Sequence, residues 1–180
     1  GKRFTVGDFK ITPQPKTPPK LFLGGMAPPA IDRAARIADG FLCTGGIGMD
    51  TYVECLAANG KAPEEGNIIL GCWAIIAEDP EAEAAIVGDH VLYQSNEYIR
   101  WGAFGPPDQT PLFPDSRTAI ENGLYELWDA DMAVEKLSGM IEQYPQISDI
   151  HFWAQFPGES IETGNRRMAY IAEKVLPRLR

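Results

Sequence analysis

The feature that most constrains the fold of this chain is a three-part unit that repeats near its N-terminus. Residues 20–23 form a short apolar run that stops at Gly24-Gly25, and an amphipathic run with Pro28-Pro29 in its first turn follows. Proline suits the first turn of a helix, so the unit predicts a strand, a glycine turn and a helix. The same order returns directly afterwards, with a strand over 41–43, a turn over 44–48 and a helix from about 50 to 59.

Further apolar segments continue this alternation. The run 68–77 is rich in β-branched and aromatic residues and predicts a third strand. Asp79 and Pro80 are typical of a helix N-cap and first helical position, so a third helix begins there. Helical spacing returns over 129–144, and a fourth strand is predicted over 150–154. The last helix carries an apolar stripe made of Met168, Ile171, Ala172, Val175, Leu176 and Leu179.

Four buried strands separated by helices predict an α/β fold with a parallel sheet. An open doubly wound sheet and part of a (β/α)8 TIM barrel both satisfy this pattern. A complete barrel needs about 250 residues, so this chain of 180 residues supplies about half of one. We divide the chain into an extended, proline-rich lead-in over 1–19 and an α/β part over 20–180. An insertion rich in aromatic residues, glycine and proline interrupts the second part at about 88–127.

The charge and the cysteine content narrow the possible partners. The chain has 16 basic and 25 acidic side chains, and the resulting formal charge of −9 argues against nucleic acid and anionic lipid. Three cysteines match neither a disulfide framework nor a zinc pattern, which favours a reducing, cytoplasmic setting. Because no apolar run has the length of a membrane helix and only two histidines occur, we predict no membrane span and no metal site.

Two glycine-rich turns are the first candidates for a binding site. In parallel α/β folds the loops after the carboxyl ends of the strands form the ligand site, because helix N-termini and free amides converge there. Gly24 and Gly25 let backbone amides approach an anion, and Thr44 with Gly45 and Gly46 adds a hydroxyl and further amides. Neither turn matches a P-loop or a full dinucleotide motif, so a phosphate site and two ordinary tight turns both stay open.

Two histidines and two aromatic residues each allow more than one interpretation. His90 precedes the aromatic part of the insertion, where a solvated or capping role competes with a functional one. His151 lies in the fourth strand, and the alternation of that strand decides whether it faces the barrel interior or the helix layer. Trp101 and Phe104 form a lid over a flat ligand, or they bury themselves or contact another subunit.

Two arginines begin the last helix. Arg166 and Arg167 lie close in sequence to Glu159 and Glu162, and a surface ion pair is the simpler interpretation. A contact to an anionic ligand is the alternative.

Several segments are recognisable when they are taken together. They are Leu21-Phe22-Leu23-Gly24-Gly25, Arg33-Ala34-Ala35-Arg36, Asp39-Gly40-Phe41 and the closing Val175-Leu176-Pro177-Arg178-Leu179-Arg180. These segments resemble the C-terminal half of the bacterial luciferase-like monooxygenase family, and the end of the fourth strand, over 154–158, resembles its last strand-to-helix turn. The resemblance spans nearly the whole chain and fails mainly in the insertion.

The resemblance implies a (β/α)8 barrel that uses FMN or the deazaflavin coenzyme F-420, with the cofactor phosphate held by the turn that matches Gly24 and Gly25. The stretch 41–46 is similar to the matching strand end of deazaflavin-dependent glucose-6-phosphate dehydrogenases. This similarity implies that Thr44, with Gly45 beside it, lies close to the cofactor or the substrate.

The same resemblance bears on the substrate. The sugar-phosphate enzymes carry a lysine where this chain has Ile47. The difference argues against a phosphorylated sugar and favours a small, unphosphorylated, less polar organic substrate. Ile47, Trp101 and Phe104 would border it.

The family's first four strand-helix units supply its acid/base groups, and they have no counterpart in this chain, so the catalytic residues stay unknown. The leading hypothesis is the C-terminal part of a flavin- or deazaflavin-dependent oxidoreductase or monooxygenase that is inactive alone. The alternative is a non-catalytic half-barrel module that pairs with itself or with another chain. Because exposed edge strands associate, we expect a homo-oligomer or a missing N-terminal half. An open-sheet phosphate-ester enzyme needs an acid/base pair that the sequence does not offer.

Overall fold

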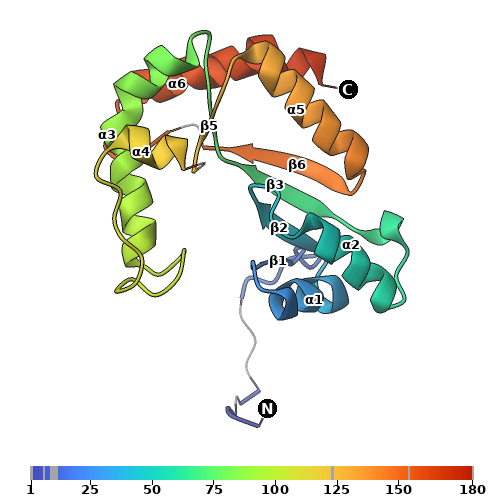
Figure 1. Ribbon diagram of the computed structural model, residues 1–180. Helices are drawn as coiled ribbons and strands as arrows, with labels where there is room; N and C mark the ends of the chain where they lie inside the picture. The colour runs from blue at the N-terminus through green and yellow to red at the C-terminus, as the bar shows by residue number, and fades with distance from the viewer. Residues whose placement is uncertain (1, 6, 9–11, 123, 154, 180) are drawn as a thin grey trace.

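The main sheet of the protein has four parallel strands. The computed structural model describes residues 2–5, 7–8, 12–122, 124–153 and 155–179. The strands pair in the order β1 (Phe22–Gly24), β2 (Gly40–Thr44), β3 (Ile68–Cys72) and β6 (Ile147–Phe152) (Figure 1). All three pairings are parallel, which confirms the predicted α/β fold with a parallel sheet. A second, two-stranded parallel sheet joins β4 (Ala74–Ile76) to β5 (Glu126–Trp128).

In the described part of the chain, five α-helices lie between the strands and a sixth follows the last strand. The predicted N-cap at Asp79 is present, because its carboxylate accepts a hydrogen bond from the amide of Ala82 at 3.0 Å. The helices are α1 (Pro28–Ile37), α2 (Met49–Ala58), α3 (Pro80–Arg100), α4 (Ser116–Glu121), α5 (Ala130–Gln143) and α6 (Ile161–Tyr170), with 3₁₀ turns at Pro63–Glu65 and Leu176–Arg178 and a π turn at Ile171–Val175.

The sheet buries one face and leaves the other open. In β2, Phe41 and Cys43 are buried, whereas the alternate residues Leu42 and Thr44 are exposed. The buried side packs on α1 and α2, where the ring of Phe41 stacks on Tyr52 at 5.2 Å. Side chains alternate across a strand, so Leu42 and Thr44 belong to the face that would form the interior of a barrel.

The prediction of a single strand over 68–77 is wrong, because this run forms two strands that belong to different sheets. β3 alternates between buried and half-buried residues, and the chain then leaves the main sheet at Trp73. All three residues of β4 are buried, between α3 and the last helical segment. The second part of the run is apolar throughout because β4 is covered on both faces. The composition of the run therefore does not show where the chain passes from the main sheet to the second sheet.

The last helix also differs from its prediction. α6 ends at Tyr170, and the chain continues through the π turn into a 3₁₀ turn that contains Pro177. Ile171 and Val175 are buried as expected, whereas Met168 and Leu176 lie about half exposed. A π turn has more residues per turn than an α-helix, so the predicted apolar stripe does not stay on one face.

The segment described as an insertion contains more regular structure than its composition indicates. Residues 88–100 continue α3, α4 falls between 88 and 127, and β5 begins at Glu126 within this segment. Regular order is interrupted mainly over 101–115, where no helix or strand occurs. The fourth strand starts at Ile147 instead of Ile150, and Ala154 at its predicted end lies outside the described residues.

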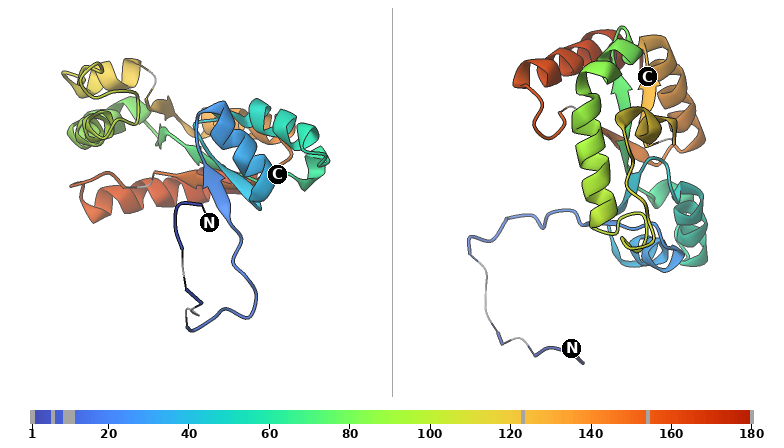
Figure 2. Two further views of the ribbon diagram at one scale, coloured as in Figure 1. Left: turned by 90° about the horizontal axis from the view of Figure 1, so that it is seen from below. Right: turned by 60° about the vertical axis from the view of Figure 1, so that its left-hand side comes forward.

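The lead-in stands apart from the sheet. Residues 12–21 are exposed and contain no helix or strand, and Figure 2 shows this segment looping away from the rest of the molecule. In the described part of the chain, no helix is both long and apolar enough to cross a bilayer.

Candidate active site

The two glycine turns lie at the same edge of the sheet. β1 and β2 are parallel neighbours, with Gly24 paired to Leu42, so the turns that follow them leave the sheet side by side. In Figure 1 the arrow of β6 points to the side where α3 and α4 lie, and the parallel strands end on that side together. The carboxyl ends of the strands therefore face the segment that follows α3.

At two positions in these turns the backbone conformation and the close packing require glycine. Gly25 has a φ of +155°, and a Cβ added to it would lie 2.5 Å from the Cβ of Ala30. Gly48 has a φ of +83° at the start of α2, and a Cβ there would lie 2.5 Å from Cδ1 of Ile31. A side chain at either position would strain the turn and push on α1, so both turns need glycine for the backbone itself.

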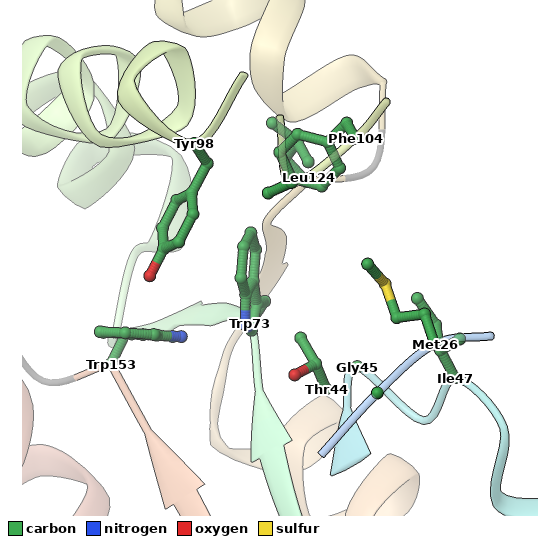
Figure 3. A pocket seen from close by; sticks show the side chains of 11 residues that line it. Met26, Thr44, Gly45, Ile47, Trp73, Tyr98, Phe104, Leu124 and Trp153 are labelled. Atoms are coloured by element: carbon green, nitrogen blue, oxygen red, sulfur yellow. The ribbon is translucent and has the colours of Figure 1, made fainter. Parts of the chain in front are cut away.

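A cavity of about 430 Å³ opens at this edge (Figure 3). Trp73, which follows β3, stands at its centre, with Trp153 and Tyr98 on one side and Thr44, Met26 and Ile47 on the other. The lining residues are Gly25, Met26, Thr44, Gly45, Ile47, Trp73, Tyr98, Ala103, Phe104, Leu124 and Trp153.

The aromatic residues of this cavity form one connected group around Trp73. Its ring lies 5.7 Å from that of Tyr98, and it meets Trp153 edge to face at 6.2 Å. Phe104 also meets Trp73 edge to face, at 6.4 Å, and Tyr125 stacks on it from behind at 5.3 Å. These distances are typical of favourable aromatic pairs, so the group presents a preformed flat, apolar wall.

None of the described residues that line this cavity carries a charge. The backbone of the second turn is partly engaged, because the amide of Gly45 donates to the carbonyl of Gly71 at 2.7 Å and that of Ile47 donates to Thr44 at 3.0 Å. Beneath the turn, burial raises the pKa of the Cys43 thiol to about 11, against a backbone hydrogen bond from Gly46 that lowers it. The thiol is protonated at neutral pH and takes no part in charge stabilisation.

The structure brings some of the predicted site residues together and leaves others out. Gly25, Thr44, Gly45, Ile47 and Phe104 all line the cavity. Gly24 ends β1 and is not among the lining residues, and Trp101 is 70% exposed and packs on the ring of Tyr98 at 5.7 Å.

Sequence reasoning missed the residues that form most of the aromatic wall. Trp73 and Trp153 each directly follow a strand of the main sheet, where a bulky side chain is carried to the carboxyl end of that strand. Their position directly after a strand was the sequence signal that could have identified them as site residues. No such signal marked Tyr98, because the helix that begins at Pro80 was not predicted to extend as far as residue 98.

The two histidines have different surroundings. Nδ1 of His90 lies 3.1 Å from the carbonyl of Pro157, which links α3 to the loop after β6. His151 is paired in register with Gly71, and Gly71 with Thr44, so the three residues lie across one face of the sheet. Among the described residues, no group of three or more histidine, cysteine, aspartate or glutamate side chains is arranged to hold a metal ion.

The arginine pair at α6 is an internal ion-pair cluster. Arg167 is 2% exposed and contacts Glu159 at 2.5 Å, as predicted, but the surface setting expected for it is wrong. It also contacts Glu83 of α3 at 2.8 Å, and Arg166 reaches the same carboxylate at 2.8 Å. Burial opposes the charge of Arg167, but hydrogen bonds to the two glutamates raise its pKa above the usual value. Both guanidinium groups are engaged with carboxylates.

Comparison with known proteins connects this geometry to a family. A family model described as luciferase-like monooxygenase matches residues 1–136. The chain is 36% identical over 193 aligned positions to the F420-dependent glucose-6-phosphate dehydrogenase of Beutenbergia cavernae, an alignment that covers 100% of this chain and 54% of that protein.

Solved structures show the same fold. An F420-dependent secondary alcohol dehydrogenase in complex with an F420–acetone adduct superposes with a TM-score of 0.62 at 15% identity, over 100% of this chain and 55% of that one. The oxygenating component of 3,6-diketocamphane monooxygenase from Pseudomonas putida, in complex with FMN, gives a TM-score of 0.58 at 13% identity, over 90% and 49% of the two chains.

Fold and cavity together define a class: a partial parallel α/β barrel with a cavity at the carboxyl ends of its strands. The chain belongs to the luciferase-like monooxygenase family, which confirms the resemblance seen in the sequence. It spans about half the length of the curated relatives that it matches. The relatives are oxidoreductases, so the family is enzymatic.

Proposed function

We propose that this chain is the C-terminal part of a flavin- or deazaflavin-dependent oxidoreductase that binds its cofactor at the cavity described above. The observation that carries the proposal is that both glycine turns and an aromatic wall border one cavity at the carboxyl ends of the strands. In barrel enzymes this end of the strands holds the active site. The cavity volume of about 430 Å³ is in the range of small-molecule sites.

The residues of the cavity fit a flat, uncharged ring with a phosphate-bearing tail. Trp73, Tyr98 and Trp153 offer ring faces and edges, and they exclude water from the ring. Since none of the described lining residues is cationic, backbone amides near Gly25 and in the turn that follows Thr44 would hold the phosphate. When bound, the cofactor supplies the redox chemistry, and this chain orients it.

The proposed class of substrate is inferred from the residues at the mouth of the cavity. Ile47 and Met26 are about half exposed there, and Phe104 faces the wall from the other side. An apolar mouth without a cation favours a small, unphosphorylated organic substrate over a sugar phosphate. Trp101, which packs on Tyr98, would support this wall from outside.

Titration of FMN and of F420 into the chain, followed by absorbance and by quenching of tryptophan fluorescence, tests the proposal. Ile47→Asp places a negative charge at the mouth and should weaken binding of either anionic cofactor about 2- to 5-fold, the size of an exposed charge interaction. Ile37→Asp is the matched control, because Ile37 is 57% exposed at the far end of α1. Saturable binding of neither cofactor, or equal weakening by both variants, would overturn the proposal.

A second candidate function is favoured by the open sheet. β1 and β6 each have one strand neighbour in the main sheet, and the exposed Leu42 lies on its open face. We propose as the alternative that the chain is a non-catalytic half-barrel that pairs with a second copy, so that two sets of four parallel strands close one barrel. Light scattering during size-exclusion chromatography separates the candidates, because a stable dimer that binds neither cofactor supports this module and a cofactor-binding monomer refutes it.

A further inference from the structure

A second cavity adjoins the aromatic one, on the open face of the main sheet. Its volume is about 580 Å³, and it is lined by Leu42, Cys43, Thr44, Gly71, Trp73, Ile150, His151, Phe152 and Trp153. Thr44, Trp73 and Trp153 line both cavities, so the two spaces meet at these side chains. A molecule whose apolar body lies against the aromatic wall in the first cavity can therefore extend into the second cavity, on the open face of the sheet.

The open face carries two polar side chains at this point, on either side of a glycine. Thr44 of β2 pairs in register with Gly71 of β3, and Gly71 pairs with His151 of β6. Neighbouring strands lie about 4.8 Å apart, so the Cα atoms of Thr44 and His151 are about 10 Å apart across the gap. Thr44 and His151 are both exposed, in strands where Cys43, Ile150 and Phe152 contribute to the packed cores.

Gly71 keeps the space between these side chains clear. It has no side chain of its own, and an added Cβ would lie 3.1 Å from the carbonyl of Cys43, closer than an ordinary contact. The gap above Gly71 is therefore bounded by a hydroxyl on one side and an imidazole on the other. Each group can donate or accept a hydrogen bond, depending on the rotamer of the hydroxyl and the tautomer of the ring.

The chemistry of the ligand follows from what surrounds this polar pair. The described residues that line the two cavities include no aspartate, glutamate, lysine or arginine. On the open face of the sheet, away from the backbone amides of the glycine turns, a charged ligand group would lose its hydration without a counter-charge. An alcohol or carbonyl oxygen is small and uncharged. It can accept a hydrogen bond from one of the two groups while the other group contacts it from the opposite side.

We propose that Thr44 and His151 form a binding site for the oxygen of an uncharged alcohol or carbonyl compound whose apolar body lies against Trp73 and Trp153. The proposal rests on the oxidoreductase function proposed above and names the class of its substrate. His151 acts here as a positioning residue that fixes the oxygen above Gly71. The aromatic wall holds the carbon skeleton.

The histidine content of the chain makes the site directly observable. The chain has two histidines, so the imidazole resonances of His151 and His90 can be separated by NMR and assigned with a His90→Gln variant. Titration with cyclohexanol should shift the His151 signal in a saturable manner and leave that of His90 unmoved, since His90 contacts the loop at Pro157. Cyclohexylamine, which is cationic, and cyclohexanecarboxylate, which is anionic, should bind at least tenfold more weakly.

Thr44→Val tests the other half of the site. Valine keeps the shape of threonine and removes its hydroxyl, so cyclohexanol affinity should fall about 2- to 10-fold, as for one lost hydrogen bond. Thr51→Val is the matched control, because Thr51 lies on α2 and lines neither cavity. An unshifted His151 signal, or equal affinity of Thr44→Val and the parent chain, overturns the inference.

The outcomes separate this inference from the proposed function. Cofactor binding without a cyclohexanol-dependent shift of His151 would refute the oxygen site and leave the oxidoreductase proposal standing. A saturable His151 shift that Thr44→Val weakens, without any cofactor binding, would support the site and refute the cofactor proposal.

Discussion

At the scale of single residues, the core contains a polar atom that lowers its stability. The side chain of Tyr125 is 1% exposed and lies between the rings of Trp73 and Phe156, each at 5.3 Å. Within the described structure its hydroxyl has no hydrogen-bond partner, and burial raises its pKa. A buried polar group without a partner carries a desolvation cost that an apolar group of the same shape avoids.

We therefore expect Tyr125→Phe to increase the free energy of unfolding by about 1 kcal/mol, measured by urea denaturation. Tyr52→Phe is a suitable contrast, because the equally buried hydroxyl of Tyr52 accepts a hydrogen bond from the amide of Asn67 at 3.4 Å. This second change should be neutral or destabilising. A loss of stability in Tyr125→Phe would contradict the expectation.

The three cysteines should differ in reactivity. Burial raises the pKa of Cys43 to about 11 and that of Cys72 to about 12, whereas Cys55 is only partly buried. The thiolate is the reactive form, and its fraction grows as the pH approaches the pKa. At pH 8 the folded chain should react with iodoacetamide at Cys55 alone, and urea should expose all three sites, as judged by mass spectrometry. Native labelling of Cys43 at pH 8, or native labelling that persists in Cys55→Ser, would refute this.

At the scale of elements, the ion-pair cluster connects α3 to α6. Arg167 is its centre, because it contacts Glu83 of one helix and Glu159 just before the other, and all three side chains are buried. Its guanidinium also lies 5.2 Å from the ring of Phe156. Removal of one member of a buried ionic cluster leaves charges without partners in a medium that solvates them poorly.

Arg167→Met should lower the free energy of unfolding by about 3 to 5 kcal/mol. Arg166→Met is the matched control, since the side chain of Arg166 is 56% exposed and Glu83 keeps its contact with Arg167. We expect that change to cost at most about 1 kcal/mol. Denaturant unfolding of both variants is the measurement, and equal losses would show that the cluster does not act as a buried clamp.

The elements also show how far local pattern determines this structure. Strand-turn-helix units with Pro28-Pro29 and Asp79-Pro80 as start signals were predictable, because capping and glycine turns are local properties of the sequence. The transfer of the chain between sheets at Trp73 was not, because it depends on pairing with β5, some 50 residues later. The glycine turns of the candidate site were predicted, whereas the place of Tyr98 in its aromatic wall depends on how far α3 extends.

At the scale of the whole molecule, four parallel strands stop short of closure. In the part of the chain that the structure describes, both outer strands of the main sheet have one neighbour, and no layer of helices covers one face of the sheet. Leu42 on that face is 42% exposed. Open edges and uncovered apolar faces promote association, either with a second copy or with a complementary half.

If copies of the chain associate through this face, Leu42→Glu should shift the equilibrium to monomers by at least tenfold in sedimentation experiments. A charge at this position would be buried by closure of the barrel and would oppose it. Ile161→Glu is the control, because Ile161 is 70% exposed on α6 and lies outside the main sheet. Equal association of the two variants would show that the open face is not the contact.

The length of α3 links distant parts of the molecule. Glu83 sits in the buried cluster near one end of this 21-residue helix, and Tyr98 lines the cavity near the other. The two positions are about 22 Å apart along the helix axis, so a tilt of about 5° at the anchored end would swing the tyrosine ring by about 2 Å. We therefore expect substitutions at Glu83 to alter ligand affinity at the cavity, although Glu83 does not line it.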